Sequence, residues 1–254
     1  MDKFEKRPLV VDFIHRSFRD VADRDYICAR ACYRLKFSQQ FLWSALQAVE
    51  KYLKAILLYN DRSAKGLGHN IEAAYRWLDE IEDIDFDIPA VVEEFLRYLN
   101  REGANRYFEF PYVTTGDELL LLDRTVWHLR RYCQPFDREL IEINGRKIDS
   151  FAMQMKATHH PRYKDKPNKF EIASGFLEKV LADKHSPARL ELVWRNFWYG
   201  TYTRTKLRNV TLHSDSAHPT HILHPEIFPE LDKRVSFSRP VRDYSFKRLH
   251  KRAP

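Results

Sequence analysis

The chain has 254 residues, 44% hydrophobic and 31% charged, with a formal net charge of +7 and a pI near 9.2. This composition supports a packed core and excludes wholesale disorder. No segment approaches the roughly 20 apolar residues that a membrane span needs, and the charged N-terminal residues do not form a signal peptide. We therefore expect a cytoplasmic protein without a membrane partner. The basic balance favours nucleic acid or another polyanion as the partner.

The cysteine count is odd and sparse, with Cys28, Cys32 and Cys133 the only three. Such a count argues against a disulfide framework and indicates a reducing compartment. Cys28 and Cys32 lie four residues apart on a predicted helix, so their side chains are neighbours. Because no histidine or second cysteine pair accompanies them, packing is favoured over a metal or redox role.

Residues 21–133 predict a bundle of five helices, because apolar residues recur at helical spacing while turn residues fall between the segments. Three of the predicted helices span residues 21–37, 69–81 and 117–133. A long helix capped by Ser38 lies between the first two. Another, which starts at Asp87 and Pro89 and ends at Gly103, precedes the last. Short connections between helices of this length are typical of an up-and-down bundle.

The second half changes character. Leu140–Ile143 and Arg146–Asp149 flank an Asn-Gly pair, which is the strongest short signal for a β-hairpin. A helix is predicted over 170–182. A second follows, with Ser186 as cap, Pro187 in the first turn and Gly200 after its end. Short strands are predicted at 201–207 and 210–213.

These elements predict a mainly α protein, an N-terminal antiparallel helical bundle with a smaller α+β C-terminal extension. The predicted domains are the bundle at 1–136, a small α+β domain at 137–232 and a basic tail at 233–254. From residue 233 the tail carries eight lysines and arginines against a single aspartate, with aromatic residues interleaved.

The tail is a candidate nucleic-acid interface, because basic side chains bind phosphates and aromatic rings stack on bases. The candidate residues are Arg242, Tyr244, Lys247, Arg248, Lys251 and Arg252. A solvated extension and an arm that docks on a partner subunit are the open alternatives.

The long helix carries a more specific pattern, formed by Gln47, Ala48, Glu50, Lys51, Leu53, Lys54 and Ala55. Gly68-His69-Asn70-Ile71 opens the next helix, and an Arg106-Tyr107 pair follows later. Together these residues resemble the HEPN superfamily (higher eukaryotes and prokaryotes nucleotide-binding domains) over about residues 20–133. The resemblance implies a helical bundle, frequently a homodimer.

HEPN members act in RNA cleavage, in toxin–antitoxin and antiviral systems, or as non-catalytic partners of nucleotidyltransferases. The resemblance therefore implies RNA or a nucleotide as ligand, a second copy or a nucleotidyltransferase as protein partner, and no cofactor. The candidate nucleotide-binding residues are Gln47, Lys51, Lys54, His69 and Arg106. The residues alone leave a structural alternative open, because Glu50 and Lys54 can pair at i, i+4 and His69 can bond across helices.

The superfamily's ribonucleases use an arginine followed by a histidine after four to six residues. Arg208 and His213 have this spacing, while Arg124 and His128 stand at the expected place but are one residue closer. In metal-independent RNA cleavage the histidine would move protons and the arginine would stabilise charge on the phosphate. An endoribonuclease is therefore the enzymatic alternative.

Two further features of the sequence bear on function. Histidines crowd the segment 213–224, but a zinc site needs three or four convergent ligands and the spacing matches no metal signature, so no metal is expected. The segment 189–199 carries four aromatic residues on a predicted helix. Such a load indicates burial or an interface, so a non-catalytic protein-interaction module is the third functional hypothesis.

Overall fold

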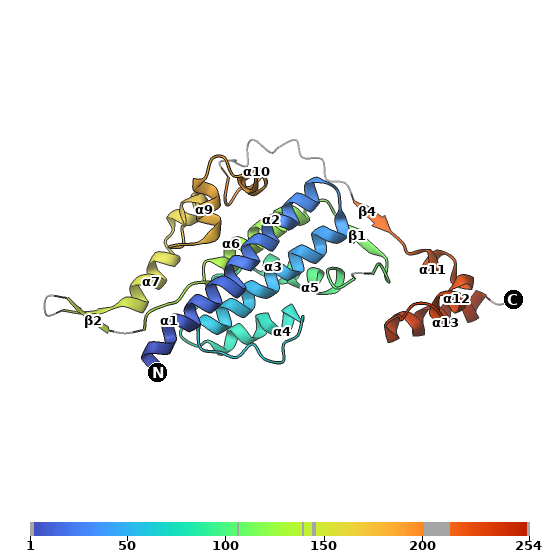
Figure 1. The fold of residues 1–254 in the computed structure, drawn as a ribbon, viewed down its shortest axis with the longest axis horizontal. Helices are drawn as coiled ribbons and strands as arrows, with labels where there is room; N and C mark the ends of the chain where they lie inside the picture. The colour runs from blue at the N-terminus through green and yellow to red at the C-terminus, as the bar shows by residue number, and fades with distance from the viewer. Residues whose placement is uncertain (1–2, 106, 139, 144–145, 201–213, 253–254) are drawn as a thin grey trace.

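The computed structural model describes residues 3–105, 107–138, 140–143, 146–200 and 214–252. The protein is mainly helical with a minor β component, as the sequence predicted. A helical bundle forms the first half, and the second half adds short helices and two small antiparallel strand pairs (Figure 1). Within the described ranges, every helix is too short or too polar to span a lipid bilayer.

The chain opens with a helical rod about twice as long as predicted. Helix α1 (Lys3–Ile14) runs through a π-helical turn, η1 (His15–Arg19), into α2 (Asp20–Arg34). Sequence patterning missed α1 because it has no single apolar stripe. Ile14 is buried, while Leu9, Val10 and Phe13 are exposed.

Helix α3 (Ser38–Tyr59) packs along this rod and forms the centre of the bundle. Its apolar residues, including Leu46, Val49, Leu53 and Ile56, are almost fully buried. The prediction that Ser38 caps the helix is wrong. Phe37 occupies the cap position, no side chain bonds to the first backbone amides, and Ser38 is already helical.

The remaining bundle helices are α4 (Ile71–Arg76), followed by the 3₁₀ turn η2 (Trp77–Glu80), then α5 (Ala90–Glu102) and α6 (Glu118–Arg130). Helix α4 begins two residues later than predicted because Asn70 is its cap, accepting a hydrogen bond from the Ala73 amide. The predicted start at Pro89 and end at Gly103 of α5 are confirmed to within one residue.

The predicted hairpin is confirmed, with β2 (Leu140–Ile143) antiparallel to β3 (Arg146–Asp149). Four short helical elements that follow are α7 (Ser150–Thr158), α8 (Arg162–Asp165), η3 (Pro167–Lys169) and α9 (Phe176–Ala182). Helix α9 starts six residues later than predicted. Ser174 has φ 59°, a left-handed conformation that no helix accommodates.

Helix α10 (Pro187–Val193) begins as predicted but ends early. Trp194 is extended and Arg195 has φ 50°, so the aromatic segment that follows is not helical. The predicted aromatic helix over 189–199 is therefore wrong in its second half, although Tyr199 is buried as expected.

The C-terminal part joins the bundle through β1 (Tyr112–Thr114), which pairs with β4 (Asp215–Ala217). Its helical elements are α11 (Thr220–Leu223), η5 (Pro225–Ile227), α12 (Phe228–Asp232) and α13 (Arg239–Arg252). Most of the basic tail is therefore a helix. The strands predicted at 201–207 and 210–213 lie outside the described residues.

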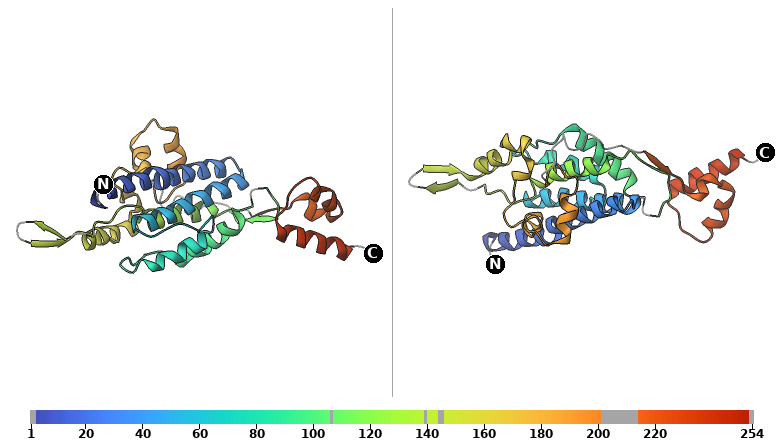
Figure 2. Two further views of the ribbon diagram at one scale, coloured as in Figure 1. Left: turned by 60° about the horizontal axis from the view of Figure 1, so that its bottom comes forward. Right: turned by 90° about the horizontal axis from the view of Figure 1, so that it is seen from above.

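The C-terminal helices lie at one end of the bundle and the β2–β3 hairpin lies at the other (Figure 2). Leu177, Val180 and Leu192 of α9 and α10 belong to the same hydrophobic core as the bundle. Phe228 and Val241 are buried outside that core, in the C-terminal helices. The three-domain division at residues 136 and 232 stays a prediction.

Candidate functional site

The predicted nucleotide-binding residues of α3 meet the loop before α4. Glu50 is almost buried, and its two carboxylate oxygens accept from Lys54 Nζ at 2.7 Å and lie 2.9 Å from His69 Nδ1. Lys54 Nζ also donates to the Gly68 carbonyl at 2.7 Å. We call Glu50, Lys54 and His69 the Glu50 clasp. The clasp holds the loop against α3. Lys54 and His69, two of the predicted nucleotide-binding residues, are therefore close together in the fold.

Lys51 has its own partners on the neighbouring helix. Its Nζ lies 2.6 Å from Asp25 Oδ2 on α2 and 3.1 Å from Gln47 Oε1. The lysine charges on this surface are thus matched by carboxylates within the protein. An incoming phosphate would have to displace Asp25 or Glu50, so the geometry favours the structural alternative for these residues. Arg106 lies outside the described residues.

The candidate pair Arg124 and His128 lies on α6. His128 is 8% exposed, and its Nδ1 lies 2.9 Å from the Asp87 carbonyl oxygen and 3.1 Å from Arg131 Nη2. Burial and the neighbouring Arg131 lower the pKa of His128 to about 4. A buried imidazole that stays neutral at pH 7 is poorly suited to protonate a leaving group on RNA. The other pair, Arg208 and His213, lies outside the described residues.

The bundle contains a buried charge network that sequence reasoning missed. Arg130 donates Nε to Asp23 Oδ1 at 2.7 Å and Nη2 to Asp23 Oδ2 at 3.0 Å. The same guanidinium donates to both oxygens of Glu178 on α9, at 2.8 and 2.7 Å. Tyr52 OH adds a bond of 2.6 Å to Asp23. Burial opposes the charges, but the carboxylates raise the Arg130 pKa, so the guanidinium stays charged.

A second buried arginine continues this network on α2. Arg30 donates to the carboxylate of Asp123 and, on the other side, to the backbone carbonyls of Glu191 and Trp194. Tyr26 OH also donates to Asp123, at 2.6 Å. Both networks therefore join the bundle to the segment that carries α9 and α10. Their role is to hold this segment in place, because Arg30 and Arg130 donate to groups on α9, on α10 and directly after α10. Asp123 Oδ2 is buried without a hydrogen-bond partner among the described residues.

A signal for these networks exists in the sequence. Asp23, Tyr26 and Arg30 recur at helical spacing on the face of α2 that also carries the fully buried Ala22 and Ala29. Polar residues on a core-facing stripe are uncommon and need partners.

The basic C-terminal residues divide between two faces of α13. Tyr244 is 49% exposed, and Lys247 and Arg248 lie one helical turn further along. Arg248 Nη1 contacts Tyr244 OH at 3.3 Å. We call Tyr244, Lys247 and Arg248 the α13 basic face. Arg242 is turned away from it and donates to Asp232 Oδ2 at 2.8 Å.

Within the part of the chain that the structure describes, neither Lys247 nor Arg248 has a carboxylate partner, in contrast to Lys51 and Lys54. Lys251 and Arg252 belong to the last turn of α13. Among the described residues, the basic face therefore presents two cations without a carboxylate partner beside an exposed aromatic ring.

Two of the C-terminal histidines have local partners. His221 packs against the rings of Phe228 and Phe237, with Nε2 3.1 Å from the Glu109 carbonyl oxygen, and His224 Nδ1 lies 3.1 Å from Glu226 Oε1. Among the described residues, no three His, Cys, Asp or Glu side chains converge as a metal site would require.

The chain matches no protein-family model, no curated protein and no solved structure. Functional inference therefore starts from this chain's own residues, and the α13 basic face is the strongest surface candidate among those described.

Proposed function

We propose that this protein binds single-stranded RNA through the α13 basic face. The observation that carries the proposal is the state of Lys247 and Arg248, which are cationic side chains without a carboxylate partner on the described surface. Tyr244 lies one helical turn before them, with about half of its surface accessible. Cations and an exposed ring side by side are the two elements of a single-strand interface.

Phosphate contacts supply most of the affinity of such an interface, because each releases condensed counterions. The aromatic ring adds stacking, which is available with every base and so is tolerant of sequence. The composition of the segment from residue 233 supports this assignment, since the segment contains eight basic residues and one acidic residue. We expect weak sequence preference and strong dependence on salt.

We further propose that the helical part is a HEPN-type bundle that serves as a scaffold for this interface. Support comes from the Glu50 clasp, in which the lysine-rich face of α3 and the histidine before α4 meet as the resemblance implies. The proposed setting is a stress or defence system in the cytoplasm. A homodimer and a nucleotidyltransferase partner stay predictions.

The test is the affinity for a fluorescently labelled single-stranded RNA, measured by anisotropy over a salt series. For the double variant Lys247→Ala/Arg248→Ala we expect weaker binding at low salt. We also expect the slope of log K against log salt to be less steep by about 1.4, since each single-strand phosphate contact contributes about 0.7.

The matched control is Lys164→Ala/Lys166→Ala, which removes the same charge from two exposed lysines in and after α8. This variant should keep the wild-type slope. Equal losses in the two double variants would reduce the effect to net charge and contradict a defined interface on α13. Absence of RNA binding by the wild type would end the proposal.

The endoribonuclease alternative gains no support from Arg124 and His128, since the imidazole is buried and neutral. Incubation of wild type with RNA in EDTA, followed by electrophoresis, tests cleavage separately from binding. Because Arg208 and His213 lie outside the described residues, His213→Ala is the variant to compare if cleavage occurs.

A further inference from the structure

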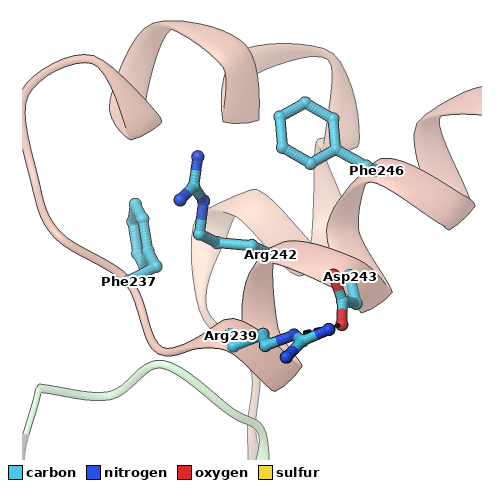
Figure 3. A pocket seen from close by; sticks show the side chains of 5 residues that line it. All are labelled: Phe237, Arg239, Arg242, Asp243 and Phe246. Carbon is cyan, nitrogen blue, oxygen red and sulfur yellow. Dashed lines mark ion pairs between the residues drawn. The ribbon is translucent and has the colours of Figure 1, made fainter.

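An open hollow lies beside α13, and its lining includes none of the three residues of the basic face. It has a volume of about 460 Å³ and is lined by Phe237, Arg239, Arg242, Asp243 and Phe246 (Figure 3). This volume is in the range of small-molecule sites, roughly 300–1,000 Å³. Arg242 extends between the two phenyl rings that form the walls. The lining therefore combines flat apolar surfaces with two guanidinium groups.

The walls of the hollow are fixed by the small C-terminal core. Phe237 and Phe246 each pack against Phe228, with ring centroids 5.1 and 5.2 Å from it. Both are only partly buried, so part of each ring faces the hollow. Phe237 also contacts His221. Rings held in this way stack on a ligand without a large loss of side-chain entropy.

The two arginines of the hollow differ in their freedom. Arg242 is held by Asp232, which is 14% exposed and lies 2.8 Å from Nη2. Arg239 is 93% exposed, and its described partner is Asp243, at 3.8 Å and itself largely exposed. Such a solvated pair is weak, so an incoming phosphate can replace Asp243 as the partner of Arg239.

We propose that this hollow binds one unstacked nucleobase of the RNA strand, with the adjoining phosphate on Arg239. The inference rests on the proposed RNA binding and adds a site on a second face of α13. A flat apolar ring fits the phenyl faces, and Arg242 offers donors to the edge of the base. A single-stranded nucleotide unit supplies both a ring and an anion.

The site predicts that the protein distinguishes RNA from a chain of the same charge without bases. The two probes are a short single-stranded RNA and an abasic oligomer with the same number of phosphates. For the wild type we expect tighter binding of the RNA by roughly 5- to 150-fold, the factor that one stacked base is worth. Phe237→Leu should lower this preference by the share of the hollow and leave the share that stacking on Tyr244 provides, whereas Phe237→Tyr should retain both.

Because Phe237→Leu also removes packing contacts in the small C-terminal core, a second variant tests the site without disturbing that core. Arg239→Gln changes an exposed side chain, so the fold should survive, which thermal unfolding checks. It should weaken RNA binding severalfold, because Arg239 contacts the phosphate that adjoins the bound base. The control is Arg234→Gln, another exposed arginine with a carboxylate partner, Glu230, that does not line the hollow. Arg234→Gln should leave the RNA affinity close to that of the wild type.

The outcomes separate the two proposals. Equal affinity of the wild type for RNA and the abasic oligomer would overturn the nucleobase site, whereas the Lys247/Arg248 dependence would still support the basic face. A preference that keeps its wild-type size in Phe237→Leu, or an RNA affinity that keeps its wild-type value in Arg239→Gln, would also overturn the site, because the strand would then be held elsewhere. Failure of the wild type to bind either chain would overturn both.

Discussion

Arg130 on α6 and Asp23 on α2 form a two-point pair in the bundle interior, with N–O distances of 2.7 and 3.0 Å and exposures of 2% and 0%. The partners are 107 residues apart in the chain. The guanidinium extends the pair to Glu178 on α9, which places one positive charge between two carboxylates. Through this contact, α9 in the second half of the chain stabilises the helical bundle in the first half.

The first prediction concerns this network. Arg130→Met should lower the free energy of unfolding by about 3–5 kcal/mol, because the buried Asp23 and the partly buried Glu178 would lose their cationic partner. Urea unfolding followed by circular dichroism measures the change. The control is Arg97→Met, whose pair with Glu93 is about half exposed on α5, and which should cost less than about 1 kcal/mol. Similar costs for the two variants would contradict a structural role for the network.

The second prediction concerns the pH dependence of stability. The pKa of His128 is about 4 in the folded state, against about 6.5 for an ordinary histidine. As the pH falls below 6.5, the unfolded chain gains a proton on His128 that the folded protein does not accept. The free energy of unfolding should therefore decrease between pH 6.5 and about 4.

His128→Asn should make this decrease shallower, because an amide can still donate to the Asp87 carbonyl but does not titrate. Urea unfolding at a series of pH values measures the slope. The exposed His185 provides the control, and His185→Asn should keep the wild-type slope. An unchanged slope in His128→Asn would show that the burial of this imidazole is not what couples stability to pH.

Local signals explain which elements could be predicted from the sequence. The hairpin Leu140–Ile143 and Arg146–Asp149 follows from an Asn-Gly pair and its flanking residues. The bundle helices follow from apolar periodicity, which α3 shows over its whole length. Gly103 was expected as a helix-ending glycine. Its φ is −69°, so no left-handed conformation requires a glycine here. A Cβ at this position would lie 2.8 Å from Leu46 Cβ, so the close packing of α5 on α3 explains why the residue is glycine.

Long-range pairing explains what could not be predicted. Arg30 binds the Trp194 carbonyl from 164 residues away, and the backbone leaves the helix at this point, with Arg195 at φ 50°. No local pattern carries that information, so α10 was predicted too long. For the candidate site, the basic residues of α13 were identified from composition. The sequence does not show which of these residues pair with a carboxylate. Arg242 pairs with Asp232, and only the fold brings these two residues together.

The third prediction separates the two readings of the α3 lysines. Glu50→Gln removes the carboxylate that Lys54 and His69 share, and Lys54→Met removes its main donor. Each should lower the free energy of unfolding by about 1–3 kcal/mol, the cost of breaking a buried charge-assisted bond. The affinity for RNA should not change, because the Glu50 clasp faces the loop before α4. Lys65→Met, on an exposed lysine of that loop, should change neither quantity.

The opposite result for Lys54→Met would favour the nucleotide-binding reading. If RNA or nucleotide affinity fell while the unfolding free energy stayed at the wild-type value, Lys54 would be a ligand contact and not part of a clasp. Anisotropy and urea unfolding on the same preparation decide between the two.

The fourth prediction concerns the cysteines of the bundle. Cys28 is exposed on α2, whereas Cys133 is fully buried at the end of α6, and burial raises the pKa of its thiol well above the usual range. Burial and the adjacent Cys28 raise the pKa of Cys32 to about 11. Since the thiolate is the reactive species, iodoacetamide at neutral pH should label Cys28 first, Cys32 slowly and Cys133 only on unfolding. Mass spectrometry of tryptic peptides measures the order.

The control is Cys28→Ser, which should abolish the rapid phase of labelling. Rapid labelling of Cys133 in the native protein would contradict its packing against α3, where Cys133 Sγ lies 3.5 Å from the Tyr52 carbonyl oxygen.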